Sequence, residues 1–169
     1  MKTIRMHRRV ALFVSAIMLV LPISPATAQG GRDNDAPVDI SFTKWVTAFP
    51  RMEGVTGGAV DGVFVGEILQ RQVSVNPNLN GIIRLEAIYE VHDSKGAFFT
   101  ALIRGGTDAV TGAALLDGVI LAGWRVGAAV HVEFQTISAA TGDCVGAPQA
   151  ATTCFSGTIH VGRAPTRNN

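Results

Sequence analysis

Cysteine and histidine are the residues of this sequence best suited to chemistry, and both are few. The two cysteines, Cys144 and Cys154, lie at the ends of the segment CVGAPQAATTC. This separation is not the Cys-x-x-Cys spacing of a thioredoxin-like redox site, and no histidines stand at the spacing of a zinc site. Two cysteines in an exported protein most often pair. We therefore predict a Cys144–Cys154 disulfide that closes this loop.

Histidine could supply a metal site or a general base. The histidines after the N-terminal region are His92, His131 and His160, each on the polar face or at the end of an expected strand. If the cysteines bridge the last two strands, His131 and His160 lie about 24 Å apart at ~3.4 Å per residue. No His-Glu-x-x-His motif occurs either. We expect no shared metal ion.

Other catalytic motifs are absent from the sequence. No Gly-x-Ser-x-Gly nucleophile motif occurs. Residues 54–58, GVTGG, lack the lysine of a phosphate-binding loop and are predicted to form a turn. A carboxylate pair for glycoside hydrolysis stays open, but nothing places two at a useful separation; the strand-borne candidates are Asp61, Glu67, Glu86 and Glu133. We predict no catalytic residue, no cofactor and no metal.

The N-terminal 28 residues have the pattern of an export signal. Residues 1–9 carry four basic side chains and no acid, residues 10–21 are apolar except for Ser15, and residues 26–28 are Ala-Thr-Ala. A charged start, a short apolar run and small residues at the exit are typical of a secretory signal peptide. The run is shorter than the ~20 residues that span a bilayer. We predict cleavage after Ala28 and export to the periplasm or the extracellular space, with no membrane segment in the mature chain.

Removal of this segment changes the charge balance. The chain has 14 basic and 13 acidic side chains, so 10 basic against 13 acidic remain and the net charge becomes −3. No block of basic residues remains to attract nucleic acid or acidic lipid. We expect no nucleic-acid partner.

Composition and patterning favour an all-β fold. Strand-forming residues are abundant after residue 28, and all 19 glycines lie there at short intervals. We predict a small antiparallel meander β-barrel of about six to eight strands, with a β-sandwich as the alternative. This β-domain spans residues 38–163, between a disordered leader at 29–37 and a frayed tail at 164–169.

One hairpin permits a register prediction. From Ile83 to Val91 every second residue is apolar, and residues 97–103 return as a second apolar run. With a three-residue loop at 94–96 and Gly96 in a bulge, the apolar side chains of both strands lie on one face of the hairpin and the polar ones on the other. A two-residue loop does not give this separation. The predicted register places Val91 opposite Phe99 and Tyr89 opposite Ala101. It also places Glu86 opposite Arg104, as a cross-strand salt bridge.

The remaining segments give simpler expectations. We expect a strand at 38–49, with Trp45 and Phe49 in the core, and one or two strands within 59–75. We expect turns at 51–58 and 105–112, and a continuous strand at 113–122 that bends at Gly118. We also expect inward side chains at every second position from Val126 to Phe134, and a last strand from Phe155 to Val161.

Residues 103–107, IRGGT, are similar to the Gly-Gly-Thr turn of plant dirigent proteins, which are exported eight-stranded barrels. The likeness covers only these residues. Asp108 and Val110 stand where that family has a glycine and an aromatic residue. The resemblance favours a barrel over a sandwich.

The expected function follows from a β-fold without a reactive motif. Aromatic side chains inside a barrel fill the core or line a cavity; the candidates for cavity lining are Tyr89, Phe99, Phe134 and Phe155. We predict a non-enzymatic module that binds a small apolar ligand or a partner surface. The alternatives are a cofactor-independent cyclase or isomerase, with Tyr89 beside a cavity, and a structural or adhesion protein with a filled core. The volume of the interior separates these hypotheses.

Overall fold

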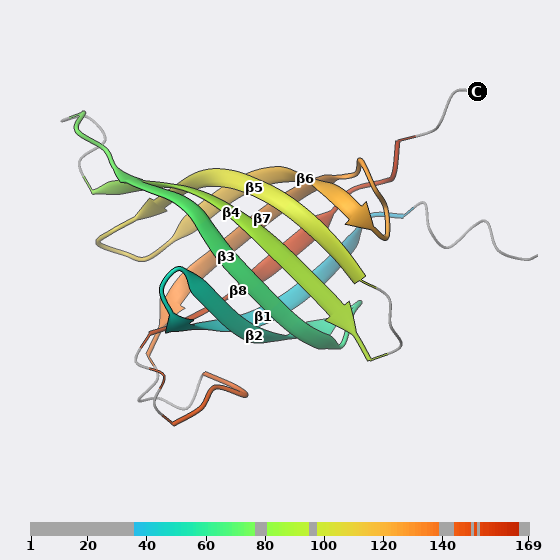
Figure 1. Ribbon diagram of the computed structural model, residues 1–169, viewed down its shortest axis with the longest axis horizontal. Coiled ribbons are helices and arrows are strands. Elements are labelled where there is room, and N and C mark those ends of the chain that lie inside the picture. Colours follow the sequence, from blue (N-terminus) through green and yellow to red (C-terminus); the bar gives the residue numbers. More distant parts are fainter. Residues whose placement is uncertain are drawn as a thin grey trace, which may run out of the picture. The chain divides into compact units, whose positions relative to one another are not determined.

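The chain folds into a closed β-barrel of eight antiparallel strands (Figure 1). This computed structural model describes residues 36–76, 81–94, 98–138, 144–149, 151 and 153–165. No helix among these residues is long and apolar enough to cross a membrane. The strands are β1 (Val38–Ala48), β2 (Arg51–Gly58), β3 (Gly62–Val73), β4 (Ile82–Asp93), β5 (Phe98–Asp108), β6 (Ala114–Gly123), β7 (Ala129–Ile137) and β8 (Cys154–Val161).

The strands follow one another around the barrel, and β1 pairs with β8 to close it. Closure leaves no unpaired edge strand, which removes a site of aggregation. The predicted all-β meander barrel is therefore confirmed, and the sandwich alternative is not. The cleavage after Ala28, the leader at 29–35 and the tail at 166–169 lie outside the described residues.

The predicted hairpin register is confirmed in β4 and β5. Val91 pairs with Phe99, and Tyr89 pairs with Ala101. The Glu86–Arg104 salt bridge also forms, with 2.6 Å between Arg104 Nε and Glu86 Oε2. This exposed pair contributes about 0.2–1 kcal/mol. Gly96, the predicted bulge residue, lies outside the described residues.

Two segments that were predicted as turns form strands. The prediction failed because the glycines in these segments allow neighbouring strands to approach closely. Residues 51–58 form β2, and residues 105–108 belong to β5. A Cβ atom on Gly54 would lie 2.9 Å from the Cα atom of Lys44 on β1. Glycine at this inward position lets two strands approach closely, so it marks a coiled strand and not a turn.

Three further expectations concern single strands. Residues 62–73 form one strand, with an irregularity between Ile68 and Gln70. β6 is continuous through Gly118, as predicted, and a Cβ atom there would lie 2.9 Å from Ile103 Cα. The predictions for two side chains were wrong: Phe49 is 68% exposed beyond the end of β1, and Val126 is 51% exposed in the turn before β7.

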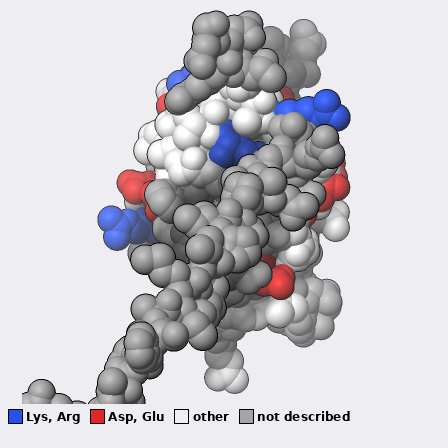
Figure 2. All heavy atoms as spheres, turned by 90° about the vertical axis from the view of Figure 1, so that its right-hand side faces the viewer, with Lys and Arg blue, Asp and Glu red and all other residues white. Residues whose placement is uncertain are grey.

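One end of the barrel is filled. Trp124 packs against Phe99, with ring centroids 6.4 Å apart, and the buried Arg125 guanidinium lies 4.3 Å from the Trp124 ring centroid. Arg125 also donates a hydrogen bond to the Gly162 carbonyl. Figure 2 faces the end of the barrel at which β4 and β6 finish, and basic and acidic side chains are interspersed on its described surface.

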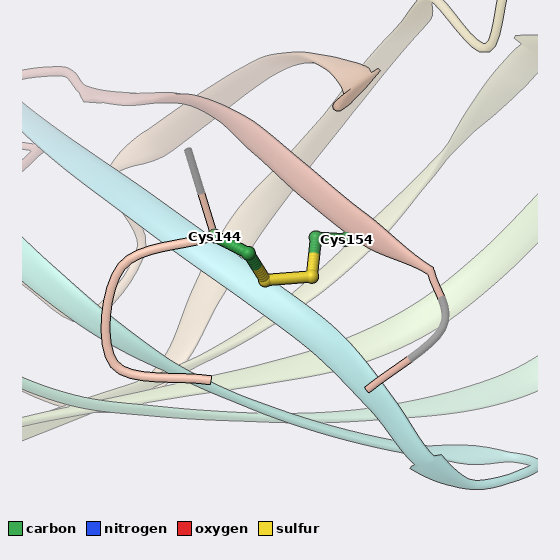
Figure 3. Close-up of a disulfide and its surroundings, with 2 residues drawn as sticks. All are labelled: Cys144 and Cys154. Carbon is green, nitrogen blue, oxygen red and sulfur yellow. A yellow bond between two sulfur atoms is a disulfide. The ribbon is translucent and has the colours of Figure 1, made fainter. Parts of the chain in front are cut away.

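The predicted disulfide is confirmed. Cys144 and Cys154 are bonded, with Cα atoms 6.0 Å apart, and the bond joins the loop before β8 to the first residue of that strand (Figure 3). Cys154 pairs in register with Trp45 of β1. Trp45 is buried as predicted; Gly146 of the same loop lies against its indole. The disulfide therefore holds a loop over the outer side of Trp45.

Replacement of both cysteines by serine should lower the free energy of unfolding by about 2–3 kcal/mol, because the ten-residue loop gains entropy in the unfolded chain. Urea unfolding of the double variant and the wild type checks this value. Equal midpoints under oxidising conditions would contradict a stabilising role of the bridge.

Candidate functional site

A pocket of about 420 Å³ occupies the end of the barrel opposite Trp124. Side chains at this end surround its mouth, including Phe49 and Ala109 from the turns and Arg71 from β3. Its volume lies within the ~300–1,000 Å³ range of small-molecule sites. The wall is mainly apolar, and its deeper residues include Met52, Ala87, Tyr89, Leu116, Phe134 and Phe155.

Lys44 is a buried amine on the wall of this pocket. It is 1% exposed and lies on β1 with the inward residues Ile40 and Phe42. The sequence analysis did not identify it. The period-two alternation of Ile40, Phe42 and Lys44 along β1 was the available signal, because side chains two apart point to the same face of a strand.

The amine of Lys44 donates a hydrogen bond to the Tyr89 hydroxyl, which comes from β4. Tyr89 is the only tyrosine in the chain and is 2% exposed. Burial lowers the pKa of Lys44 well below its ordinary value, because the charged ammonium loses its hydration. Burial also raises the pKa of Tyr89, which keeps the phenol neutral. Burial thus favours the uncharged form of both groups.

Five aromatic rings surround the Lys44 Nζ atom. The ring centroid of Phe134 lies 3.7 Å from Nζ and that of Tyr89 lies 4.5 Å away. The other three centroids lie at 5.2 to 5.7 Å and belong to Phe42, Phe155 and Phe64. Aromatic faces attract a cation within about 6 Å. The cage therefore offsets part of the cost of any positive charge at Nζ.

A carboxylate partner for Lys44 does not occur among the described residues that line the pocket. Asp108 is the one acid there, and its carboxylate accepts hydrogen bonds from the backbone N–H groups of Thr111 and Val110. These bonds lower the pKa of Asp108. The Asp108 carboxylate thus closes the β5–β6 turn at the pocket mouth.

The four side chains predicted to line a cavity separate into two groups. Tyr89, Phe134 and Phe155 lie together on the pocket wall. Phe99 is 1% exposed and lies at the filled end against Trp124.

His131 and His160 lie side by side on the outer surface, so the expectation that they are far apart was wrong. They are paired in register between β7 and β8, with ring centroids 5.9 Å apart. The expected register assumed that the disulfide joins these strands, but Cys144 lies in the loop. Acids flank both rings, with Asp117 2.7 Å from His131 Nδ1 and Asp39 2.7 Å from His160 Nδ1. Among the described residues, no group of three or more side chains is arranged to hold a metal ion.

Comparison with known proteins gives no relative: no family model, curated protein or solved structure matches the chain. The pocket and its residues are therefore the basis for a functional hypothesis.

The burial of Lys44 predicts a pH dependence of stability. The unfolded chain keeps Lys44 protonated up to about pH 10.4, while the folded chain releases the proton at lower pH. Unfolding then takes up a proton, so stability should rise with pH toward 10, by up to ~1.4 kcal/mol per pH unit. Lys44→Met should remove this rise.

Urea unfolding at pH 7, 8 and 9 measures the effect, with Lys95→Met as the control that keeps the wild-type dependence. Parallel pH profiles of stability for the wild type and Lys44→Met would contradict this prediction. They would show that the amine of Lys44 is protonated to the same extent in the folded and the unfolded chain.

His160, on the outer surface, predicts a dependence of opposite sign. The hydrogen bond that His160 donates to the Asp39 carboxylate raises the pKa of His160, and Glu133 adds to this effect, whereas partial burial opposes it. The resulting stabilisation is complete below the unfolded value of about 6.5 and is lost as pH rises through the folded value.

The difference in melting temperature between the wild type and His160→Gln should therefore be larger at pH 5.5 than at pH 9. His92→Gln, on β4, is the control. A difference that grows with pH would refute the assigned direction.

Proposed function

We propose that the protein binds a small apolar ligand inside the barrel. The observation that carries this proposal is the 420 Å³ pocket, whose wall is formed mainly by apolar and aromatic side chains and whose mouth lies at one end of the barrel. Concave apolar sites with a few polar groups are the usual form of small-molecule sites. The Lys44–Tyr89 pair is the polar feature deep in the wall, so it orients one polar end of a mainly apolar ligand.

We also propose that the protein acts outside the cytoplasm. The Cys144–Cys154 disulfide is weakly consistent with an oxidising compartment. The predicted signal peptide supports export to the periplasm or the extracellular space. N-terminal sequencing of the protein recovered from its native compartment tests the cleavage after Ala28.

Binding of the uncharged fluorophore N-phenylnaphthylamine tests the pocket. We expect saturable binding to the wild type. Leu85→Trp places a large ring at the pocket wall and should weaken binding at least about ten-fold, which is ~1.4 kcal/mol. Leu121→Trp is the matched control, because Leu121 is 49% exposed on β6 and does not line the pocket.

Thermal melts verify that both variants fold, and Ile83→Trp offers a second block at the same wall. Equal affinities of Leu85→Trp, Ile83→Trp and Leu121→Trp, or no saturable binding to the wild type, would overturn the proposal.

A second candidate is a cofactor-independent enzyme of the isomerase or cyclase type. The observation that favours it is Tyr89, a polar group on the pocket wall that is hydrogen-bonded to an amine. The two functions differ in the fate of the bound molecule. A binding protein releases it unchanged, whereas an isomerase releases a rearranged product, which chromatography and mass spectrometry of the recovered ligand distinguish.

A further inference from the structure

We propose that Lys44 is a covalent binding site for apolar aldehydes or ketones, which its Nζ atom captures as an imine at the wall of the barrel pocket. This inference rests on the proposed binding of an apolar ligand and names the reactive group of that ligand, a carbonyl. It starts from the position of the amine: Lys44 is buried, lines the pocket and is hydrogen-bonded to the Tyr89 hydroxyl.

The first requirement of imine formation is an uncharged amine, because only the free electron pair attacks a carbonyl carbon. The environment of Lys44 provides this state. The described residues of the pocket hold no carboxylate directed at Nζ, since Asp108 is bound to the backbone of its own turn. Loss of hydration lowers the pKa of the amine. A desolvated lysine in an apolar site is the usual form of a Schiff-base lysine.

The second requirement is a group that moves protons between nitrogen and oxygen. The Lys44 nitrogen attacks the carbonyl carbon, and the carbonyl electron pair moves to oxygen to give a carbinolamine. That oxygen then leaves as one water molecule with both amine hydrogens, and a carbon–nitrogen double bond forms. No oxidant or reductant is consumed. The Tyr89 hydroxyl contacts Nζ, so it accepts a proton from nitrogen while donating its own to oxygen.

The aromatic cage suits the uncharged imine. The rings of Phe134 and Tyr89, with centroids 3.7 and 4.5 Å from Nζ, give the product apolar surroundings. No cation has to form there, and the described residues of the pocket direct no carboxylate at Nζ that would stabilise one. A hydrophobic carbonyl compound fits this site better than a sugar aldehyde.

Reductive trapping tests the proposal within one molecule. The purified protein is incubated at pH 7.5 with decanal and sodium cyanoborohydride, and the modified peptides are quantified by mass spectrometry. The chain has three lysines, Lys2, Lys44 and Lys95, so Lys95 is an internal reference. An ordinary lysine is about 0.1% neutral at this pH. We expect the Lys44 adduct to form at least about ten-fold faster than the Lys95 adduct.

Variants distinguish the loss of the reactive amine from a loss of the folded structure. Lys44→Met, with folding verified by a thermal melt, should lose the rapid adduct. Tyr89→Phe should slow the Lys44 adduct, whereas Lys95→Arg should leave it unchanged. With glycolaldehyde, a small polar aldehyde, the preference for Lys44 should disappear.

Two results overturn the proposal in distinguishable ways. If the fluorophore binds but Lys44 reacts no faster than Lys95, the covalent site is wrong and the apolar pocket stands. If neither the fluorophore nor decanal binds, the proposed function fails with it.

Discussion

The pairing of β1 with β8 closes the barrel, and three features of chemical interest depend on the register of that pairing. It places Lys44 beside Phe155 in the pocket, Asp39 beside His160 on the outer surface, and Trp45 beside Cys154 at the disulfide. A shift by one residue would turn Lys44 outward, because neighbouring residues of a strand point to opposite faces. Closure therefore determines which side chains meet, and the disulfide loop covers the same seam from outside.

Both ends of the interior bury a basic side chain. At the filled end, Phe99 and Trp124 pack together, and the Arg125 guanidinium lies against the Trp124 ring and donates one hydrogen bond to the Gly162 carbonyl. At the pocket end, an amine is buried without a carboxylate among the described lining residues. Burial of a charged amine is expensive, so the pKa of Lys44 falls and the uncharged form is favoured. The phenol of Tyr89 and the surrounding rings reduce that cost without providing a counter-charge.

Local patterns predicted the local structure well. The alternation in residues 83–91 and the short loop at 94–96 were sufficient for the register of β4 and β5, because both strands of a hairpin are encoded within one segment. Pairings between distant segments were not accessible in this way. His131 and His160 meet only because the sheet, and not the disulfide, aligns β7 with β8. Lys44 sits on the apolar face of its own strand, but its cage needs Phe64, Phe134 and Phe155 from three other strands. Glycine was also misleading, since Gly54 marks a close approach of strands and not a turn.

The central claim is that the pocket favours the uncharged form of the Lys44 amine. A direct titration of isotope-labelled lysine side chains by NMR tests it, because the chain has only three lysines and Lys95→Arg assigns one of the signals. The account predicts that Lys44 titrates well below the ordinary lysine value, because burial lowers its pKa. Titration of Lys44 near the ordinary value of about 10.4 would contradict it.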